Sequence, residues 1–129
     1  MIKLQEPEPI SREEFEKFLR WNFPRETPVD AVYCTYIAKC PGCDVYKIGR
    51  SRNLISREQG ISGYGGFSFK MKFFINKDIE LQLLRALAYA GALRPSERYR
   101  SELFFLTHDD VAYLVKRFKF LSISEYKKS

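Results

Sequence analysis

The chain has 129 residues, a usual size for a single domain. Hydrophobic residues make up 45% of it and aromatic residues 16%, which supplies one real core and excludes a disordered chain or a disulfide-stapled mini-protein. Three cysteines cannot all pair within one chain, and the formal charge of +6 favours a polyanionic partner.

The N-terminal residues predict an intracellular protein. Residues 1–8 alternate charge and proline and lack the apolar centre of a signal peptide. No apolar run approaches the ~20 residues that span a bilayer. We therefore expect a cytoplasmic protein that does not insert into a membrane and that keeps its cysteines reduced.

Residues 1–30 are expected to form a helical extension before the main unit. Ser11 and Glu14 have the spacing of a capping box, which predicts a short helix over residues 12–22 that Pro24 ends. The apolar side of this helix is expected to pack on the main domain.

The first half of the main unit predicts a β-hairpin. Residues 31–38 are a β-branched and aromatic run typical of a strand, and residues 40–44 form a turn. A second strand over residues 45–49 returns along the first, and a short helix then runs through Arg57.

The second half predicts a third strand over residues 67–75 and a helix over residues 77–90. We expect the alternating apolar residues of this strand to share one face, and they are Phe67, Phe69, Met71, Phe73 and Ile75. A short strand over residues 102–106 and a last helix after Thr107 complete the order.

This order of elements predicts an α+β fold. Its centre is a three-stranded antiparallel sheet, made of the hairpin and the third strand, with helices beside it. Residues 31–106 form the main domain, and residues 107–129 are a C-terminal helix and tail packed on the same domain.

Five short motifs occur along these elements. In chain order they are Ala31-Val32-Tyr33, Lys47-Ile48-Gly49, Arg57, Glu80 and Glu102-Leu103-Phe104. The set resembles the GIY-YIG nuclease family over about residues 31–106. Residues 47–51, Lys-Ile-Gly-Arg-Ser, are similar to the second motif of a phage-type branch of that family. The resemblance implies a GIY-YIG-like fold and a DNA endonuclease that depends on Mg²⁺ or Mn²⁺, encoded by a phage or mobile element.

The resemblance implies four catalytic residues, whose side chains suit phosphodiester hydrolysis. Tyr33 would be the general base or would orient the attacking water, and alternation can put it on one face of the hairpin with Lys47. Arg57 supplies a planar fork for the phosphate oxygens. Glu80 supplies one hard oxygen ligand to the metal.

Each of these residues also has an ordinary structural interpretation. Taken alone, Tyr33 is a half-buried aromatic, and Arg57 and Glu80 are solvated helix charges. The motifs also depart from the family, with Ala31 in place of a glycine, Leu84 in place of a histidine and Leu103 in place of a tryptophan. These departures leave open a catalytically weak or inactive nucleic-acid-binding module, or a viral protein-interaction factor on the same scaffold.

Basic residues near these motifs are expected to face DNA phosphates, and the alternative for each is an ordinary solvated charge. They are Arg50, Arg52, Lys70, Lys72, Arg94, Arg98 and Arg100. Duplex DNA is the expected partner, with specificity supplied by a homodimer or by a second protein.

Cys40 and Cys43 have the spacing of half a zinc site. A closed site needs four ligands, and Cys34 and His108 are the remaining thiol and imidazole candidates. A turn with two reduced thiols is therefore the favoured interpretation.

Overall fold

The computed structural model describes residues 7–29, 32–61, 68–95 and 102–126. Its helices are α1 (Arg12–Asn22), α2 (Leu54–Gly60), α3 (Glu80–Tyr89), α4 (His108–Phe118) and α5 (Ile123–Tyr126). Its strands are β1 (Cys34–Lys39), β2 (Val45–Ser51), β3 (Lys70–Ile75), β4 (Leu103–Phe105) and β5 (Leu121–Ser122). Within these ranges, no helix has the length and apolar character needed to cross a membrane.

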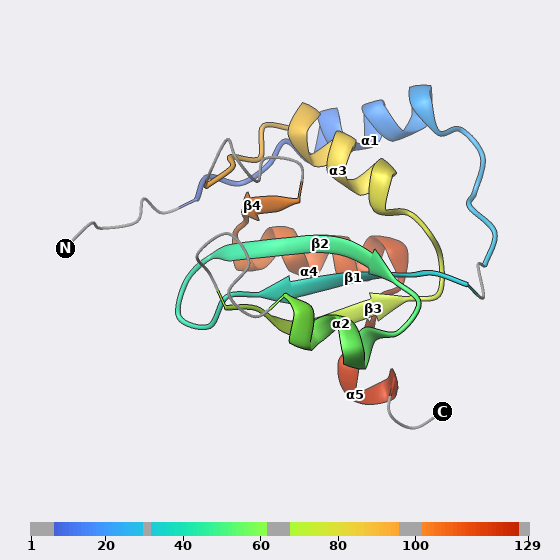
Figure 1. Ribbon diagram of the computed structural model, residues 1–129. Helices are drawn as coiled ribbons and strands as arrows, with labels where there is room; N and C mark the ends of the chain where they lie inside the picture. Colours follow the sequence, from blue (N-terminus) through green and yellow to red (C-terminus); the bar gives the residue numbers. More distant parts are fainter. Residues whose placement is uncertain (1–6, 30–31, 62–67, 96–101, 127–129) are drawn as a thin grey trace.

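The strands form one antiparallel sheet in the order β4-β2-β1-β3-β5 (Figure 1). The α+β class is confirmed, and the predicted three strands are the centre of the sheet. The sheet is wider than predicted, because β4 pairs with the edge of β2 and β5 with the edge of β3. β5 has two exposed residues, which is too short for an alternating pattern to reveal.

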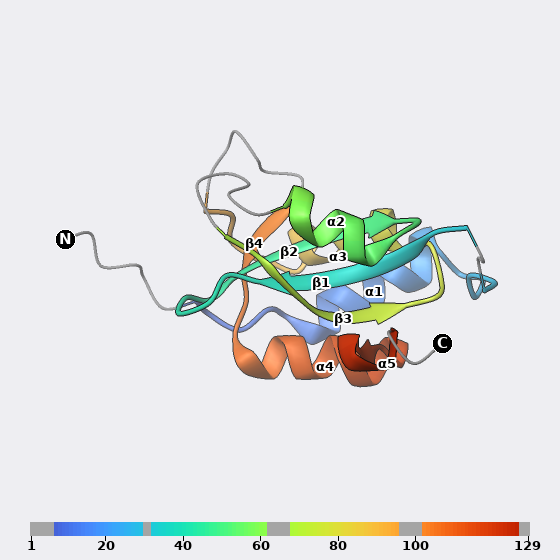
Figure 2. The same ribbon diagram turned by 60° about the horizontal axis from the view of Figure 1, so that its bottom comes forward.

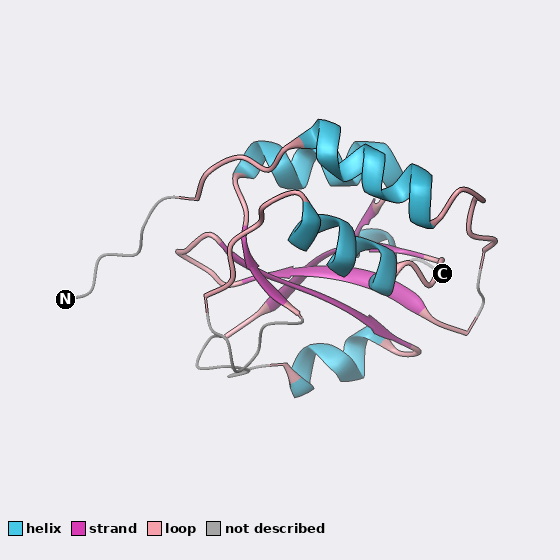
Figure 3. Ribbon diagram, turned by 90° about the horizontal axis from the view of Figure 1, so that it is seen from above, coloured by secondary structure: helices cyan, strands magenta, loops and turns pink. Residues whose placement is uncertain are grey.

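Helices pack on both faces of the sheet. Figure 2 shows α2 on one side and α4 on the other, and Figure 3 shows α1 and α3 side by side. We call the side of α1, α3 and α4 the α3 face, and its core includes Phe15, Ile37, Ile48, Leu83 and Leu114. We call the other side the α2 face, and its core includes Tyr36, Ala38, Val45, Leu54 and Leu103.

A β-bulge interrupts β3. The pairing of β1 with β3 shifts between Ile37 and Ala38, so Lys72 is an extra residue in β3. Phe67 lies outside the described residues. The other residues predicted to share a face divide into Phe69 and Met71 on the α2 face and Phe73 and Ile75 on the α3 face. The prediction of a single apolar face is therefore wrong, because an extra residue reverses the alternation.

The N-terminal helix is part of the core. The predicted helix over residues 12–22 is confirmed, and Ser11 accepts a hydrogen bond from the backbone N–H of Glu14 at its start. Phe15 is fully buried and makes edge contacts with the rings of Tyr113 and Phe118 of α4. The segment before α1 is also anchored, because the Ile10 N–H donates to the Asp110 carboxylate at 3.1 Å.

Phe15→Ala is expected to lower the free energy of unfolding by about 3–5 kcal/mol, because it removes a fully buried ring and leaves a cavity. Trp21→Ala is the matched control on the same helix, since Trp21 is 71% exposed. We expect the control to change stability by no more than about 0.5 kcal/mol. Urea denaturation of both variants measures the difference, and equal midpoints would show that α1 is not part of the cooperative core.

Candidate active site

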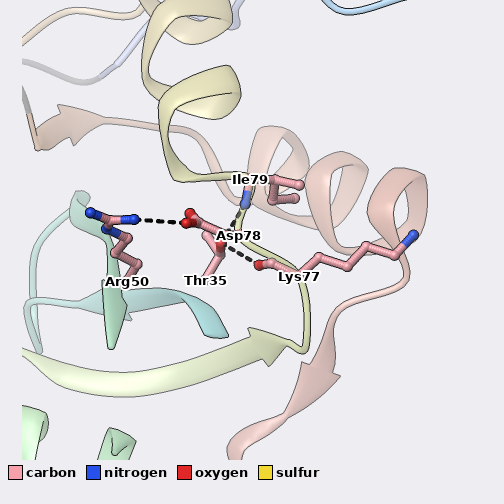
Figure 4. Close-up of polar contacts among 5 residues, drawn as sticks. All are labelled: Thr35, Arg50, Lys77, Asp78 and Ile79. Atoms are coloured by element: carbon pink, nitrogen blue, oxygen red, sulfur yellow. Dashed lines mark hydrogen bonds and ion pairs between the residues drawn. The ribbon is translucent and has the colours of Figure 1, made fainter. Parts of the chain in front are cut away.

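A threonine on β1 holds the start of α3. Thr35 is fully buried, and its hydroxyl donates to the Lys77 carbonyl at 2.7 Å and accepts from the Ile79 N–H at 2.9 Å (Figure 4). The first residue before α3, Ile79, has no side chain that can cap the helix, so β1 supplies the cap. The helix therefore begins at Glu80, later than predicted, and Asp78 is held in the turn before it.

Tyr33, Arg50 and Asp78 gather on the α3 face. Arg50 pairs with Thr35 across the hairpin, and its Nη1 donates to Asp78 Oδ2 at 2.7 Å (Figure 4). The guanidinium of Arg50 lies 4.5 Å from the centroid of the Tyr33 ring, and that of Arg52 lies 5.1 Å from it. Tyr33 is therefore a contact for two arginines.

A second group lies on the α2 face of the same hairpin. Tyr36 pairs with Gly49 across the hairpin, and its hydroxyl accepts a hydrogen bond from Arg57 Nε at 3.3 Å. The Lys47 ammonium lies 5.3 Å from the centroid of the Tyr36 ring. Tyr36 of β1 therefore contacts Lys47 of β2 through its ring and Arg57 of α2 through its hydroxyl.

Gly49 is required by the ring of Tyr36. A Cβ at this position would lie under 3.0 Å from the hydroxyl oxygen, Cζ and Cε2 of Tyr36. Because Tyr36 is fully buried, its ring has little room to move aside. The close approach of ring and backbone thus explains a glycine in the middle of β2.

Lys47 is fully buried and forms an ion pair with Glu102. The Lys47 Nζ lies 2.9 Å from Glu102 Oε2, and the Glu102 side chain is 26% exposed. The sequence interpretation noted Glu102 as part of a motif but did not place it in the site. A signal for it was present, because a lysine between Tyr46 and Ile48 on a strand needs a carboxylate partner if it is buried.

Glu80 lies in the first turn of α3 and is half-buried. Burial raises the pKa of its carboxyl above the ordinary value, and the negative charge of Glu102 adds to the rise. The positive charges of Arg50 and Lys47 oppose it in part. Arg50 on the α3 face and Lys47 on the α2 face therefore both influence the pKa of Glu80.

The chemistry of Glu80 fits a hard divalent cation. A half-buried carboxylate near a second one offers the oxygen donors that Mg²⁺ and Mn²⁺ prefer. In the described part of the chain, no three or more His, Cys, Asp or Glu side chains group so that they could hold a metal. Glu80 would therefore hold a cation that takes its remaining ligands from water and substrate.

The structure divides the four predicted catalytic residues. Lys47 and Arg57 both contact Tyr36, whereas Tyr33 lies with Arg50 on the other face of the hairpin. The hairpin register explains this, because side chains alternate between the two faces of a strand. Counting back from the turn places a tyrosine opposite Gly49, and that tyrosine is Tyr36.

The predicted DNA-binding residues are spread over the sheet. Arg50 and Arg52 both contact Tyr33. Lys70 and Lys72 are exposed on β3, which is separated from β2 by β1. The structure therefore gathers Arg50 and Arg52 at Tyr33, on the face of the hairpin opposite Tyr36, and places Lys70 and Lys72 on a different strand.

The remaining predicted cations belong to the segment between α3 and β4. The Arg94 guanidinium lies 5.5 Å from the centroid of the Phe104 ring. Arg98 and Arg100 lie outside the described residues.

Cys40 and Cys43 lie at the turn of the hairpin. The thiol of Cys43 donates to the Cys40 carbonyl at 3.7 Å. Burial and the neighbouring Cys43 thiol raise the pKa of Cys40 to about 11. All three cysteines are free thiols.

A cavity of about 390 Å³ lies elsewhere, between the segment after α1, the start of α3 and the end of α4. Its lining includes Phe23, Lys77 and Arg117, and it does not include Tyr36, Lys47 or any other candidate catalytic residue. The cavity therefore adds nothing to the candidate site.

Comparison of the chain with protein-family models, curated proteins and solved structures finds no match. Any function is therefore inferred from the residues of the chain and from their geometry.

Thr35→Val is expected to lower the free energy of unfolding by about 1–3 kcal/mol, because the Ile79 N–H and the Lys77 carbonyl lose their buried partner. Thr35→Ser keeps the hydroxyl and is expected to lose less. Amide hydrogen exchange at Ile79 reports the contact directly. Equal protection of that amide in wild type and Thr35→Val would mean that Thr35 does not hold the start of α3.

Gly49→Ala is expected to displace the Tyr36 ring and to destabilise the protein by about 1–3 kcal/mol, as overpacking does in other cores. Gly60→Ala is the control, since a Cβ there meets nothing within 4 Å. Its expected effect is neutral or stabilising by up to about 1 kcal/mol, because alanine favours the helix. Thermal melts and the ring NMR signals of Tyr36 measure both effects, and unchanged Tyr36 signals in Gly49→Ala would contradict the packing argument.

Proposed function

We propose that this chain is a metal-dependent DNA endonuclease of the GIY-YIG type that hydrolyses phosphodiester bonds. The observation that carries the proposal is the group around Tyr36. Its hydroxyl is hydrogen-bonded to Arg57 and Lys47 lies beside its ring, while the positive charge of Lys47 lowers the pKa of the Glu80 carboxyl in part. These side chains come from four elements, and they are of the types that phosphodiester cleavage uses.

Arg57 is the group of this site that would bind the phosphate. It is exposed at the surface of α2, where a DNA strand can reach its guanidinium. The planar guanidinium matches two phosphate oxygens and would stabilise the charge that develops there. Tyr36 is fully buried below it and would fix the orientation of the guanidinium through the 3.3 Å hydrogen bond. Tyr36, rather than Tyr33, is therefore the tyrosine that we assign to this site, as the partner of Arg57.

Glu80 would hold the Mg²⁺ or Mn²⁺ ion as its protein ligand. The bound ion would act as a Lewis acid on the phosphate and would make a bound water more acidic. Burial raises the pKa of the Glu80 carboxyl, and a bound cation would favour the ionised form that serves as its ligand. The buried Lys47 would supply a positive charge beside the Tyr36 ring.

Duplex DNA is the proposed substrate. Arg50 and Arg52 lie beside Tyr33 on the other face of the same hairpin, and Arg57 lies on α2. Together with the net charge of +6 they favour contact with a DNA backbone. We propose a phage or mobile-element nuclease that obtains its sequence specificity from a homodimer or from a second protein.

Cleavage of supercoiled plasmid in Mg²⁺ or Mn²⁺ tests the proposal. We expect Glu80→Gln and Arg57→Ala each to slow cutting by at least about 100-fold, because each removes a group that stabilises the transition state. Glu13→Gln, on the exposed side of α1, is the matched control and should cut like wild type. EDTA should abolish cutting.

A pair of tyrosine variants locates the site. Tyr36→Phe removes the partner of Arg57 and is expected to slow cutting more than Tyr33→Phe does. The opposite order would move the site to the α3 face of the hairpin. If wild type does not cut the plasmid but binds DNA in a salt-sensitive way, the chain is a nucleic-acid-binding module and not a nuclease. Loss of both activities would favour a protein-interaction factor.

A further inference from the structure

The position of Lys47 is costly for the fold. Its side chain is fully buried on the α2 face of β2, and Val45 of the same strand is buried on that face as well. Burying a charged ammonium without a partner costs several kcal/mol. An apolar residue of similar length, such as methionine, would fill the same space without that cost. The lysine is therefore not explained by packing.

Glu102 is held in register with Lys47 by backbone pairing. The carbonyl oxygen of Glu102 accepts a hydrogen bond from the Ile48 N–H at 3.0 Å, and the next residue, Leu103, pairs with Lys47. The Glu102 side chain then reaches the Lys47 ammonium at 2.9 Å. Backbone and side chain of Glu102 thus engage two successive residues of β2, and the carboxylate is fixed where the ammonium needs it.

The ion pair fixes where the ammonium of Lys47 lies. A lysine side chain has a flexible four-carbon stem, so its ammonium can take several positions unless a partner holds it. The ion pair with Glu102 holds the ammonium 5.3 Å from the centroid of the Tyr36 ring.

We propose that Glu102 is a positioning residue that holds the ammonium group of Lys47 beside Tyr36. This inference rests on the proposed nuclease function, since it assigns Lys47 to the active site. It also explains why a lysine and a glutamate that are 55 residues apart in the chain occur together in this fold. An ion pair that served only the fold could be replaced by apolar residues with little loss of stability.

The contact itself is tested by NMR of lysine labelled with ¹⁵N at Nζ. A buried ammonium that is hydrogen-bonded to a carboxylate exchanges its protons slowly, so wild type should show a Lys47 signal, assigned by its absence in Lys47→Met. Glu102→Gln should lose or shift this signal, and Glu102→Asp should retain it in part. Wild type without such a signal would overturn the proposal.

The positioning role is tested with the double variant Lys47→Met/Glu102→Gln, which removes both charges and should fold even if Glu102→Gln alone does not. We expect it to melt near wild type and to cut plasmid at least about 100-fold more slowly. Cutting at the wild-type rate would overturn the positioning role and leave the nuclease intact.

A third outcome separates the positioning role from the nuclease function. Wild type that shows the lysine signal but does not cut DNA would overturn the nuclease and reduce Glu102 to a structural partner.

Discussion

The contact of the Tyr36 ring with Gly49 is the constraint on which the candidate site depends. Because Gly49 has no Cβ, the ring lies directly on the backbone of β2. In that position the hydroxyl meets Arg57 of α2, and the ring lies beside the Lys47 ammonium. A larger residue at position 49 would separate three side chains that belong to three different elements.

The residue before Tyr36 organises the opposite face. Thr35 and Tyr36 are neighbours on β1, so their side chains point to opposite faces of the sheet. Tyr36 contacts α2 through Arg57, and Thr35 holds the turn into α3 through Lys77 and Ile79. One central strand therefore contacts both helices, and the charges of Arg50 on one face and Lys47 on the other both lower the pKa of the Glu80 carboxyl.

The edge strand β4 contributes both to the sheet and, through the residue before it, to the ion pair of Lys47. It completes the sheet beside β2, and the residue that precedes it, Glu102, neutralises the buried Lys47. The same carboxylate adds to the rise in the pKa of Glu80. An ion pair in this place links the pairing of an edge strand to the electrostatics of the site, which an apolar pair would not do.

The sequence by itself determined the α+β class, the hairpin, the N-terminal helix and the three central strands, because periodicity and caps are local signals. It also indicated Lys47, Arg57 and Glu80 as residues of interest by their order along the chain. It did not identify Tyr36, and it noted Glu102 only as part of a motif. Tyr33 and Tyr36 both lie in one aromatic run, and a motif comparison has no means of choosing the one that faces Gly49.

Tertiary structure alone decided which side chains meet. The bulge at Lys72 reversed the face of the end of β3, and the pairing of β4 with β2 brought Glu102 to Lys47. Both depend on hydrogen bonds between segments far apart in the chain, and a local pattern carries no information about such pairing. For the same reason the partner of a buried charge is set by the fold, even where the need for a partner can be read from the residue type.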